Sequence, residues 1–415
     1  MKFIADFHLH SKYSRATSRD MDLENLDKWA KIKGIKVLGT GDFTHPEWFG
    51  NLKIKLEPAE PGTFKLKNSE SETRFILTSE ISCIYSKGNR VRKIHIIIFA
   101  PSFEVVEKIN TQLGWIGNLK SDGRPILGLD AKELAKIVLD ASPDCLVIPA
   151  HAWTPWFAIF GSKSGFNSIE ECFEDYSKYI YALETGLSSD PAMNWRLSFL
   201  DNITLISNSD SHSPKKIGRE ANVFDTEISY REIAEAIKTK NPQKFLYTIE
   251  FYPEEGKYHF DGHRNCGVKL SPSETKKHVG LCPVCGKPLT VGVLNRIEEL
   301  ADREAGFRPP NSIPFKSLVP LEEVVADAVN QNTGTKEVVK EYQNLIEKLG
   351  SEFNILLDVP KETLQSATLP EIAEGIMRAR EGKVFKEEGY DGVYGKIRVF
   401  SHAEEKSSVK QNTLF

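Results

Sequence analysis

The first 250 residues predict a β/α barrel. Short β-branched runs alternate with amphipathic segments over this stretch, and strand–helix alternation at this spacing is typical of parallel β/α architecture. Seven strand candidates within it fit a closed barrel better than an open sheet. The expected strands are Phe3–Asp6, Lys36–Gly39, Arg74–Leu77, Ile94–Ala100, Cys145–Pro149, Ile180–Leu183 and Ile203–Ser207.

The expected helices lie between these strands. In the first, Leu23, Leu26 and Ala30 recur at helical spacing, Asp22 can cap the start and Gly34 the end. The other candidates are Phe103–Leu113, Ala131–Asp140, Ile169–Tyr176 and Tyr230–Lys238.

The remainder of the chain predicts further domains, since 415 residues exceed one typical domain. Residues 251–300 are short of periodic runs and rich in Gly, Pro, Cys and His, which indicates a small zinc-binding module after the catalytic domain at 1–250. Residues 301–400 show helical stripes and are expected to form a helical domain. Residues 401–415 are polar and are expected to be a flexible tail.

Composition excludes several classes of protein. With 40% apolar and 27% charged residues the chain is an ordinary globular protein, and its 54 Lys+Arg against 58 Asp+Glu, a net charge of −4, argue against a simple basic nucleic-acid coat. No stretch approaches the roughly 18–20 apolar residues of a membrane span, and an acid at Asp6 argues against a signal peptide. Six cysteines, three of them clustered, indicate a reducing compartment, so we expect a cytoplasmic protein.

Metal-ligand residues follow nearly every predicted strand. In a β/α barrel the carboxyl ends of the strands form the active face, and alternate residues of an extended His-x-His segment point the same way. Nine such groups exceed the needs of one ion and suit two or three. Mixed N/O ligation favours Zn, Mn or Fe over Ca or a lone Mg, although Mg stays among the candidate ions. The nine are His8, His10, Asp42, His45, Glu80, His95, His151, Asp210 and His212.

These segments resemble the motifs of the PHP (polymerase and histidinol phosphatase) family. The resemblance rests on Asp6-Phe-His8-Leu-His10-Ser, Gly39-Thr-Gly-Asp42, Ser79-Glu80, His95, Ala150-His151 and Ser209-Asp210-Ser-His212. It implies a distorted seven-stranded barrel with two or three metal ions that hydrolyses phosphoesters. The family's second motif usually reads Thr-Asp-His, whereas Gly41-Asp42-Phe43 stands here with His45 two residues further on, so Asp42 and His45 are alternative ligands.

The resemblance also implies roles for the individual residues. His8, His10, Glu80 and Asp210 would hold one ion, and Glu80 would bridge to a second held by His95 and His151. His212 would serve a third ion with Asp42 or His45. The catalytic set is then His8, His10, Glu80, Asp210 and His212, with water as the nucleophile, because paired ions lower the pKa of a shared water and neutralise phosphate charge.

A second ligand set predicts a structural zinc ion. His263-x-x-Cys266 is followed after fifteen residues by Cys282-x-x-Cys285, and four N/S ligands leave no open position for catalysis. His278 is the alternative fourth ligand. Residues 256–296 carry seven Lys/Arg and two Asp/Glu, a net +5, which fits either a phosphate contact or a solvated face.

Two loops offer candidate substrate contacts. The loop after His151 could stack aromatic rings on an extruded base and bring Gly, Ser and Lys to a phosphate, or its aromatic residues could instead pack into the barrel mouth. The loop at 186–196 is a second polar loop on that face. The candidates are Trp153, Trp156, Phe160, Ser162, Lys163, Ser164, Asn194 and Arg196. The loop Gly389–Lys396 carries two tyrosines, and chemistry alone assigns it no role.

The combination of barrel, zinc module and helical domain resembles the endonuclease Q family. The match also rests on Asp261-Gly-His263-Arg-Asn-Cys266, Cys282-Pro-Val-Cys285-Gly and Gly389-Tyr-Asp-Gly-Val-Tyr394-Gly. It implies a DNA repair endonuclease, associated with the nucleoid, that nicks 5′ to uracil, hypoxanthine, xanthine and abasic sites and leaves a 3′-hydroxyl and a 5′-phosphate. A PHP phosphomonoesterase acting on a small metabolite and a non-enzymatic DNA- or clamp-binding adaptor are the alternatives. The terminal Gln411–Phe415 is similar to a sliding-clamp binding box.

Overall fold

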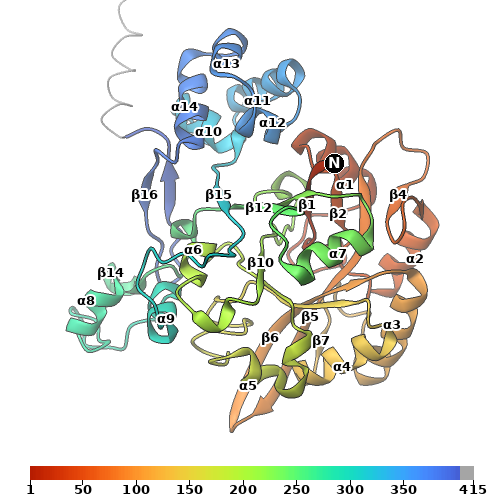
Figure 1. Cartoon of the computed structure of the whole chain (residues 1–415). Coiled ribbons are helices and arrows are strands. Elements are labelled where there is room, and N and C mark those ends of the chain that lie inside the picture. Colours follow the sequence, from red (N-terminus) through yellow and green to blue (C-terminus); the bar gives the residue numbers. More distant parts are fainter. Residues whose placement is uncertain (402–415) are drawn as a thin grey trace, which may run out of the picture.

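The computed structural model describes residues 1–401, so the predicted clamp-binding segment Gln411–Phe415 lies outside the described residues. Figure 1 shows the barrel built from the first part of the chain, with a group of C-terminal helices and the segment predicted to bind zinc along one side. We call this segment the zinc-binding module after that prediction. In the described residues no helix is both long and apolar enough to cross a membrane.

All seven predicted barrel strands are present. The strands β1, β2 and β5 pair in parallel, as do β9 and β10. The ring closes beyond the ends of β1 and β10, where Leu9 pairs with Ser211. Between β8 and β9 a backbone hydrogen bond from the Ala152 N–H to the Glu184 carbonyl (3.0 Å) is formed just past the strands, so the barrel is distorted. The strands are β1 (Lys2–Asp6), β2 (Val37–Gly39), β5 (Arg74–Lys87), β6 (Arg90–Ala100), β8 (Leu146–Pro149), β9 (Ala182–Glu184) and β10 (Thr204–Ile206).

One connection departs from the predicted strand–helix alternation. Strands β5 and β6 form an antiparallel hairpin, and β8 pairs antiparallel with β6. The turn contains Gly88 and Asn89, with φ of 62° and 58°, and left-handed residues of this kind are typical of a two-residue hairpin turn. Strand β5 therefore continues well past the predicted end at Leu77.

Further strands extend the barrel sheet on both sides. Strand β11 pairs antiparallel with β1, β12 with β11, and β15 lies parallel to β12. The strands are β3 (Leu56–Pro58), β4 (Phe64–Leu66), β7 (Ile126–Leu127), β11 (Ala221–Asp225), β12 (Phe245–Glu250) and β15 (Phe315–Ser317). Phe7, Ile97, Ile148, Ile206 and Phe224 belong to one buried apolar cluster, which supports the strand ends from below.

The five helices predicted for the barrel are present, although the one predicted at Ile169–Tyr176 is an α-helix only to Phe173, and two further helices, Pro46–Lys55 and Pro191–Asn194, were not predicted. The first of the five begins where the Asp22 side chain accepts a hydrogen bond from the Asn25 N–H and ends at Gly34 with φ of 85°, as its capping residues predict. The helices are α1 (Leu23–Lys33), α2 (Pro46–Lys55), α3 (Phe103–Ile116), α4 (Ala131–Ala141), α5 (Ile169–Phe173), α6 (Pro191–Asn194) and α7 (Tyr230–Thr239), with a 3₁₀ turn at Glu174–Tyr179.

The rest of the described chain forms the zinc-binding module and a helical group (Figure 1). The module contains β13 (Asp261–His263), β14 (Val268–Leu270), α8 (Pro272–Lys277) and α9 (Val293–Leu300). The helices are α10 (Leu321–Ala328), α11 (Lys336–Leu349), α12 (Glu352–Leu357), α13 (Lys361–Ala367) and α14 (Pro370–Arg380), followed by the hairpin β16 (Phe385–Glu387) and β17 (Lys396–Arg398). The domain boundaries near residues 250, 300 and 400 stay predictions.

A buried ion pair joins the barrel to the helical group. Lys33 Nζ lies 2.6 Å from Glu352 Oε2, and both side chains are less than a tenth exposed. Glu352 also accepts hydrogen bonds from the Tyr342 hydroxyl and the Leu321 N–H. The charges are therefore satisfied only when α1 and α12 are in place.

We predict that Lys33→Ala lowers the free energy of unfolding by about 3 kcal/mol, because it leaves the Glu352 carboxylate buried without its countercharge. The measurement is denaturant unfolding. Lys53→Ala is the matched control, since Lys53 pairs with Glu107 on the surface and such a pair contributes less than about 1 kcal/mol. Equal losses in the two variants would contradict the assignment.

Candidate metal centre

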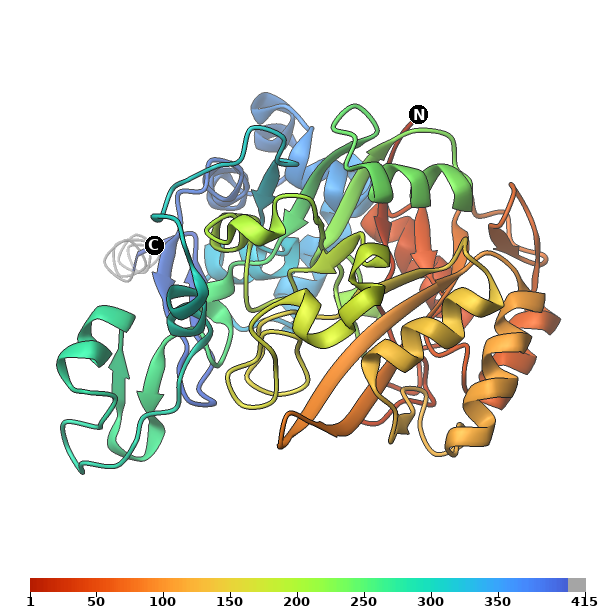
Figure 2. The same ribbon diagram turned by 60° about the horizontal axis from the view of Figure 1, so that its bottom comes forward.

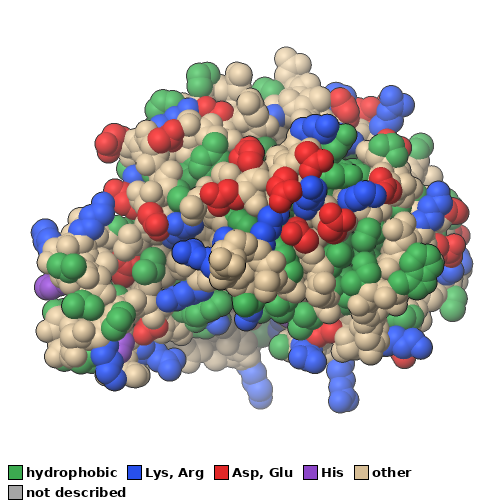
Figure 3. Space-filling view, turned by 90° about the horizontal axis from the view of Figure 1, so that it is seen from below, with side chains coloured by type: hydrophobic (Ala, Val, Ile, Leu, Met, Phe, Trp, Pro, Cys, Tyr) green, Lys and Arg blue, Asp and Glu red, His purple; other side chains and the backbone are tan. Residues whose placement is uncertain are grey.

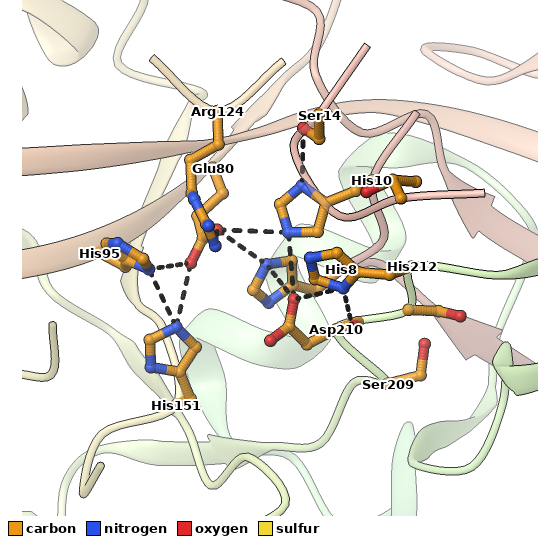
Figure 4. Close-up of polar contacts among 12 residues, drawn as sticks. His8, His10, Ser14, Glu80, His95, Arg124, His151, Ser209, Asp210 and His212 are labelled. Atoms are coloured by element: carbon orange, nitrogen blue, oxygen red, sulfur yellow. Dashed lines mark hydrogen bonds and ion pairs between the residues drawn. The ribbon is translucent and has the colours of Figure 1, made fainter. Parts of the chain in front are cut away.

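Four ligand side chains meet at the mouth of the barrel. His8 and His10, just past the end of β1, face Glu80 and Asp210 (Figure 4), and one ligand atom from each lies within 4.8 Å of the others. His10 Nε2 is 3.0 Å from Asp210 Oδ1 and 3.3 Å from Glu80 Oε2. His8 Nε2 has no hydrogen-bond partner and lies 3.6 Å from each of the same two oxygens. A buried, unpartnered imidazole nitrogen facing carboxylates fits a divalent cation.

The other oxygen of Glu80 belongs to a second group. Glu80 Oε1 lies 2.9 Å from His95 Nδ1 and 3.1 Å from His151 Nε2, and the two imidazole nitrogens are 3.1 Å apart. The three residues form a further set that could hold a metal ion. Because one carboxylate faces both sets (Figure 4), Glu80 is placed to bridge two ions.

The β5–β6 hairpin brings Glu80 and His95 together. Glu80 lies in the middle of β5, not after the strand as predicted, because the strand runs on into the hairpin. His95 of β6 stands opposite Ser82, and residues two apart on a strand share a face. Glu80 and His95 are therefore diagonal neighbours on one face of the hairpin.

Three residues of the mouth adopt positive φ just past their strands. The φ angles are 49° at Asp42, 28° at His151 and 45° at Asp210. This conformation is costly for residues with a Cβ and is concentrated at functional sites. At these positions it turns the chain sharply so that each polar side chain stays in the mouth.

Glu184, at the end of β9, orients His8 and was not among the sequence candidates. Both of its oxygens lie 3.0 Å from His8 Nδ1, and Glu184 Oε2 also accepts a hydrogen bond from the His151 N–H at 2.8 Å. A carboxylate that binds the far nitrogen of a ligating histidine fixes its tautomer and ring orientation. The sequence could have indicated Glu184, because it directly follows the sixth predicted strand, and the other candidate ligands were chosen for the same kind of position.

Asp42 is placed behind His10, where it orients that ring. Asp42 Oδ1 lies 3.1 Å from His10 Nδ1. The other oxygen accepts hydrogen bonds from the Ser11 N–H (2.6 Å), the Ser11 hydroxyl (2.7 Å) and the Ser14 hydroxyl (2.8 Å). Both oxygens are thus engaged with protein groups, and Asp42 is in none of the ligand groups found in the described residues.

His45 and His212 also lie outside those groups, so residues 1–401 assemble the predicted first and second ion sites but no third. His45 precedes helix α2, and its ring stacks on Tyr13 with the centroids 4.4 Å apart. The His212 ring lies 4.5 Å from that of His10, and its Nδ1 lies 3.0 Å from the Asp210 carbonyl oxygen.

Buried carboxylates determine the electrostatic potential at the mouth of the barrel. Burial alone would lower the pKa of His8, but the carboxylates of Glu184, Glu80 and Asp210 outweigh it and raise that pKa well above its usual value. Burial lowers the pKa of His95 to about 4, with Glu80 opposing. Burial would raise the pKa of Glu80, but His95, Arg124 and His8 hold it well below the usual range. Carboxylates that stay ionised while buried attract cations.

Arg124 is a further group that the sequence did not reveal. Its Nη1 donates to Glu80 Oε2 at 2.9 Å, and the side chain is 27% exposed. It lies in the connection between α3 and β7, which carried no ligand-like spacing. A guanidinium with free N–H groups at this position can bind a phosphate oxygen beside the ligand groups.

The predicted zinc ligands are also brought together. Ligand atoms of His263, Cys266, Cys282 and Cys285 lie within 4.8 Å of one another, with Cys285 Sγ 3.5 Å from His263 Nδ1. Burial raises the pKa of the Cys282 thiol, but the N–H groups of Cys285 and Val284 lower it to about 7, which favours the thiolate that a metal needs. His278, the alternative ligand, is not in the group.

Several predicted substrate contacts are packed inside the protein. The rings of Trp153 and Phe160 are fully buried and lie 4.9 Å apart, and Trp153 Nε1 donates to Asn194 Oδ1. These two rings therefore follow the alternative interpretation, in which aromatic residues pack the barrel mouth. Ser164 is buried and bonds its own loop, accepting from the Phe157 N–H.

The remaining candidates stand nearer the surface. The Arg196 guanidinium forms an ion pair with Glu298 at 2.6 Å. The side chain of Trp156 is 39% exposed, Lys163 is exposed and Ser162 is half-buried. Phe157 belongs to the same aromatic loop but was not among the substrate candidates, and its ring lies 4.7 Å from the His95 ring with φ of 63°.

Comparisons with known proteins agree with this architecture. The family described as the MJ0043 C-terminal domain matches residues 320–383. The uncharacterized protein YqxK of Bacillus subtilis is 30% identical over 416 residues, covering 96% of this chain and 99% of its own length. The uncharacterized protein MJ0043 of Methanocaldococcus jannaschii is 32% identical over 258 residues, which are 60% of this chain but only 31% of that protein.

Two solved structures are similar over nearly the whole chain. One is the lesion-specific endonuclease PfuEndoQ from Pyrococcus furiosus, with a TM-score of 0.86, 31% identity and coverage of 98% of this chain and 99% of its own. The other is endonuclease Q in complex with a 27-mer duplex carrying an abasic lesion at the active site, with a TM-score of 0.84, 31% identity and coverage of 97% of both chains.

We predict that Asp42→Asn weakens metal binding in the barrel about 10- to 100-fold, because loss of a partner that orients a ligand typically has this effect. Metal content after dialysis against a limiting chelator measures it. Asp140→Asn, an exposed carboxylate paired with Lys136, is the control. Unchanged metal content in Asp42→Asn would show that Asp42 does not support His10.

For the zinc-binding module, we expect Cys285→Ser to lose one equivalent of zinc, because three ligands remain of a four-ligand site. Elemental analysis of the purified protein gives the number of equivalents. His278→Ala should keep its zinc, and loss of zinc from that variant as well would reopen the choice of fourth ligand.

Proposed function

The chain belongs to the endonuclease Q family, and on this premise we propose that it is a metal-dependent endonuclease that cuts DNA at lesions. The observation that carries the proposal is the carboxylate of Glu80, which lies between two groups of possible metal ligands at the barrel mouth, where the side chains of Asp210 and His212 are partly exposed. Two ions held by one carboxylate are the arrangement that phosphodiester hydrolysis uses.

We further propose that the cut lies 5′ to uracil, hypoxanthine, xanthine or an abasic site and leaves a 3′-hydroxyl and a 5′-phosphate. Extrusion of the damaged nucleotide brings its backbone to the mouth. Extrusion costs least when the base is mispaired or missing, which itself favours lesions. Trp156, Ser162 and Lys163 lie on the loop after His151 and are the proposed contacts to that nucleotide.

The ions, when bound, supply positive charge that neutralises the phosphate and lowers the pKa of the attacking water. His8, His10, Glu80 and Asp210 would hold one, and Glu80, His95 and His151 the other. Glu184 and Asp42 keep the rings of His8 and His10 in the required orientation through their Nδ1 atoms.

Arg124 and His212 are proposed to act on the substrate. Arg124 can donate to a phosphate oxygen while it stays bonded to Glu80. His212 donates Nδ1–H to the Asp210 carbonyl, which leaves Nε2 able to accept a proton from water or return one to the leaving oxygen. Water is the nucleophile in this proposed mechanism, so no Ser or Cys side chain among the described residues has to attack the phosphate.

The proposed partnership with a sliding clamp rests on the sequence alone. A sliding clamp that binds Gln411–Phe415 would bring the enzyme to replicating or repaired DNA in the cytoplasm and nucleoid. Cleavage at lesions does not depend on this contact.

The test is incubation with labelled duplexes that carry uracil, hypoxanthine or an abasic site, with an undamaged duplex beside them. We expect nicks on the damaged strands that a chelator abolishes and added divalent metal restores. Absence of nicking on every lesion, together with release of phosphate from small phosphomonoesters, would replace this proposal by the phosphomonoesterase.

We predict that Asp210→Asn and His8→Ala each reduce nicking about a thousandfold or more, because each removes one ligand of the first group. Single-turnover rates on an abasic duplex measure the loss. Both variants should keep one equivalent of zinc in the module, and Asp140→Asn should cut like the unchanged protein. Cleavage retained in both ligand variants would refute the assignment of the centre.

A further inference from the structure

The loop at residues 388–395, between β16 and β17, is docked against the segment that leads into the zinc-binding module. Backbone N–H groups of Gly389, Gly392 and Gly395 donate to the carbonyls of Glu254, Lys257 and Glu255 at 2.8, 2.8 and 3.1 Å. A Cβ on Gly395 would lie 2.2 Å from the Glu254 carbonyl oxygen, so no side chain fits there. Figure 2 shows the loop between the zinc-binding module and the barrel loop that follows His151.

The two tyrosines of the docked loop face in different directions. Tyr390 packs on Gly262 of β13, since a Cβ at Gly262 would lie 2.5 Å from Tyr390 Cδ2. Tyr394 is 71% exposed, and its ring lies 5.5 Å from Lys257 Nζ. Tyr390 thus anchors the loop, whereas Tyr394 is presented to solvent from a fixed backbone.

Tyr394 ends a row of three aromatic rings and one lysine that begins in the loop following His151. The Trp156 and Tyr258 rings meet edge to face with centroids 5.8 Å apart. Lys257 Nζ lies between the next two rings, 5.9 Å from that of Tyr258 and 5.5 Å from that of Tyr394. We call Trp156, Tyr258, Lys257 and Tyr394 the aromatic row. It begins one residue from Phe157, whose ring contacts that of His95.

Two cationic side chains, Lys257 and Arg264, lie in or beside the aromatic row, together with the carboxylate of Asp391, which accepts a hydrogen bond from the Arg264 N–H at 2.6 Å. Arg264 is exposed beside the row, 3.6 Å from a Cβ position on Gly392. Neither Lys257 nor Arg264 forms an ion pair within residues 1–401, whereas the nearby carboxylates of Glu254 and Glu388 are paired with Lys386 and Lys269. Lys and Arg side chains also appear on and beside the lobe at the left of Figure 3.

We propose that the aromatic row is a binding subsite for unpaired nucleotides of the DNA strand next to the cut. Aromatic faces that alternate with cations along a groove stack successive bases and hold the phosphates between them. Paired bases hide these faces inside the duplex, so the subsite selects unpaired DNA. The inference rests on the proposed function, and it gives the loop Gly389–Lys396 a role in holding the opened strand.

The test measures binding of the complete metal-loaded protein to an undamaged single-stranded oligonucleotide, which offers no lesion to cut, by fluorescence anisotropy. We expect Tyr394→Ala to weaken this binding about tenfold, and Tyr394→Phe to bind like the unchanged protein, because stacking needs the ring and not the hydroxyl. Binding to a blunt duplex of the same sequence should change less than twofold in both variants.

Tyr179→Ala is the matched control. Tyr179 is also exposed, with Lys178 Nζ 5.1 Å from its ring, but it precedes β9 at the end of the barrel opposite the metal centre. We expect it to leave binding unchanged. Unaltered single-strand affinity in Tyr394→Ala, or equal losses for single strand and duplex, would overturn the proposed subsite even where lesion nicking is found; absence of nicking with the expected binding pattern would instead overturn the proposed function.

Discussion

The shared carboxylate of Glu80 is the constraint on which the mouth of the barrel depends. Its two oxygens face different sets of imidazoles, so neither set can move without the other. Glu80 is fully buried and is held ionised by His95, Arg124 and His8, an arrangement that is stable only while those positive groups or a cation stay close. Burial and charge together therefore fix the position of the centre within the fold.

The fold meets this constraint by departing from a regular β/α barrel at one place. Helical crossovers join the ends of neighbouring strands through loops of variable length, which do not by themselves fix how their side chains face one another. An antiparallel hairpin instead fixes the relative register of two long strands by backbone hydrogen bonds along their full length. Glu80 and His95 lie on that hairpin, so its register sets the position of Glu80 relative to one of its histidines.

The barrel and most of the ligands could be predicted because they follow from local periodicity. His8 and His10 were found from alternation in an extended segment, and the zinc ligands from spacing alone. Asp42 could not be placed, since only the fold shows that its oxygens already accept from Ser11 and Ser14. The burial of the Trp153 and Phe160 rings could not be predicted either, because the sequence of an aromatic-rich loop is the same whether its rings pack inward or face a ligand.

The separation of charge explains how a chain of net charge −4 can be proposed to bind DNA. The carboxylates nearest the proposed cut lie in the barrel mouth, buried among histidines and Arg124, where bound cations would cancel their charge. A local excess of positive charge lies elsewhere, on residues 256–296 with net +5, which include Lys257 of the aromatic row. A strand would then cross a positive surface before it reaches the centre, and screening by salt acts on that approach more than on the buried ligands. A negative net charge and nucleic-acid binding are compatible because the local excess of positive charge lies on the surface that the strand would cross.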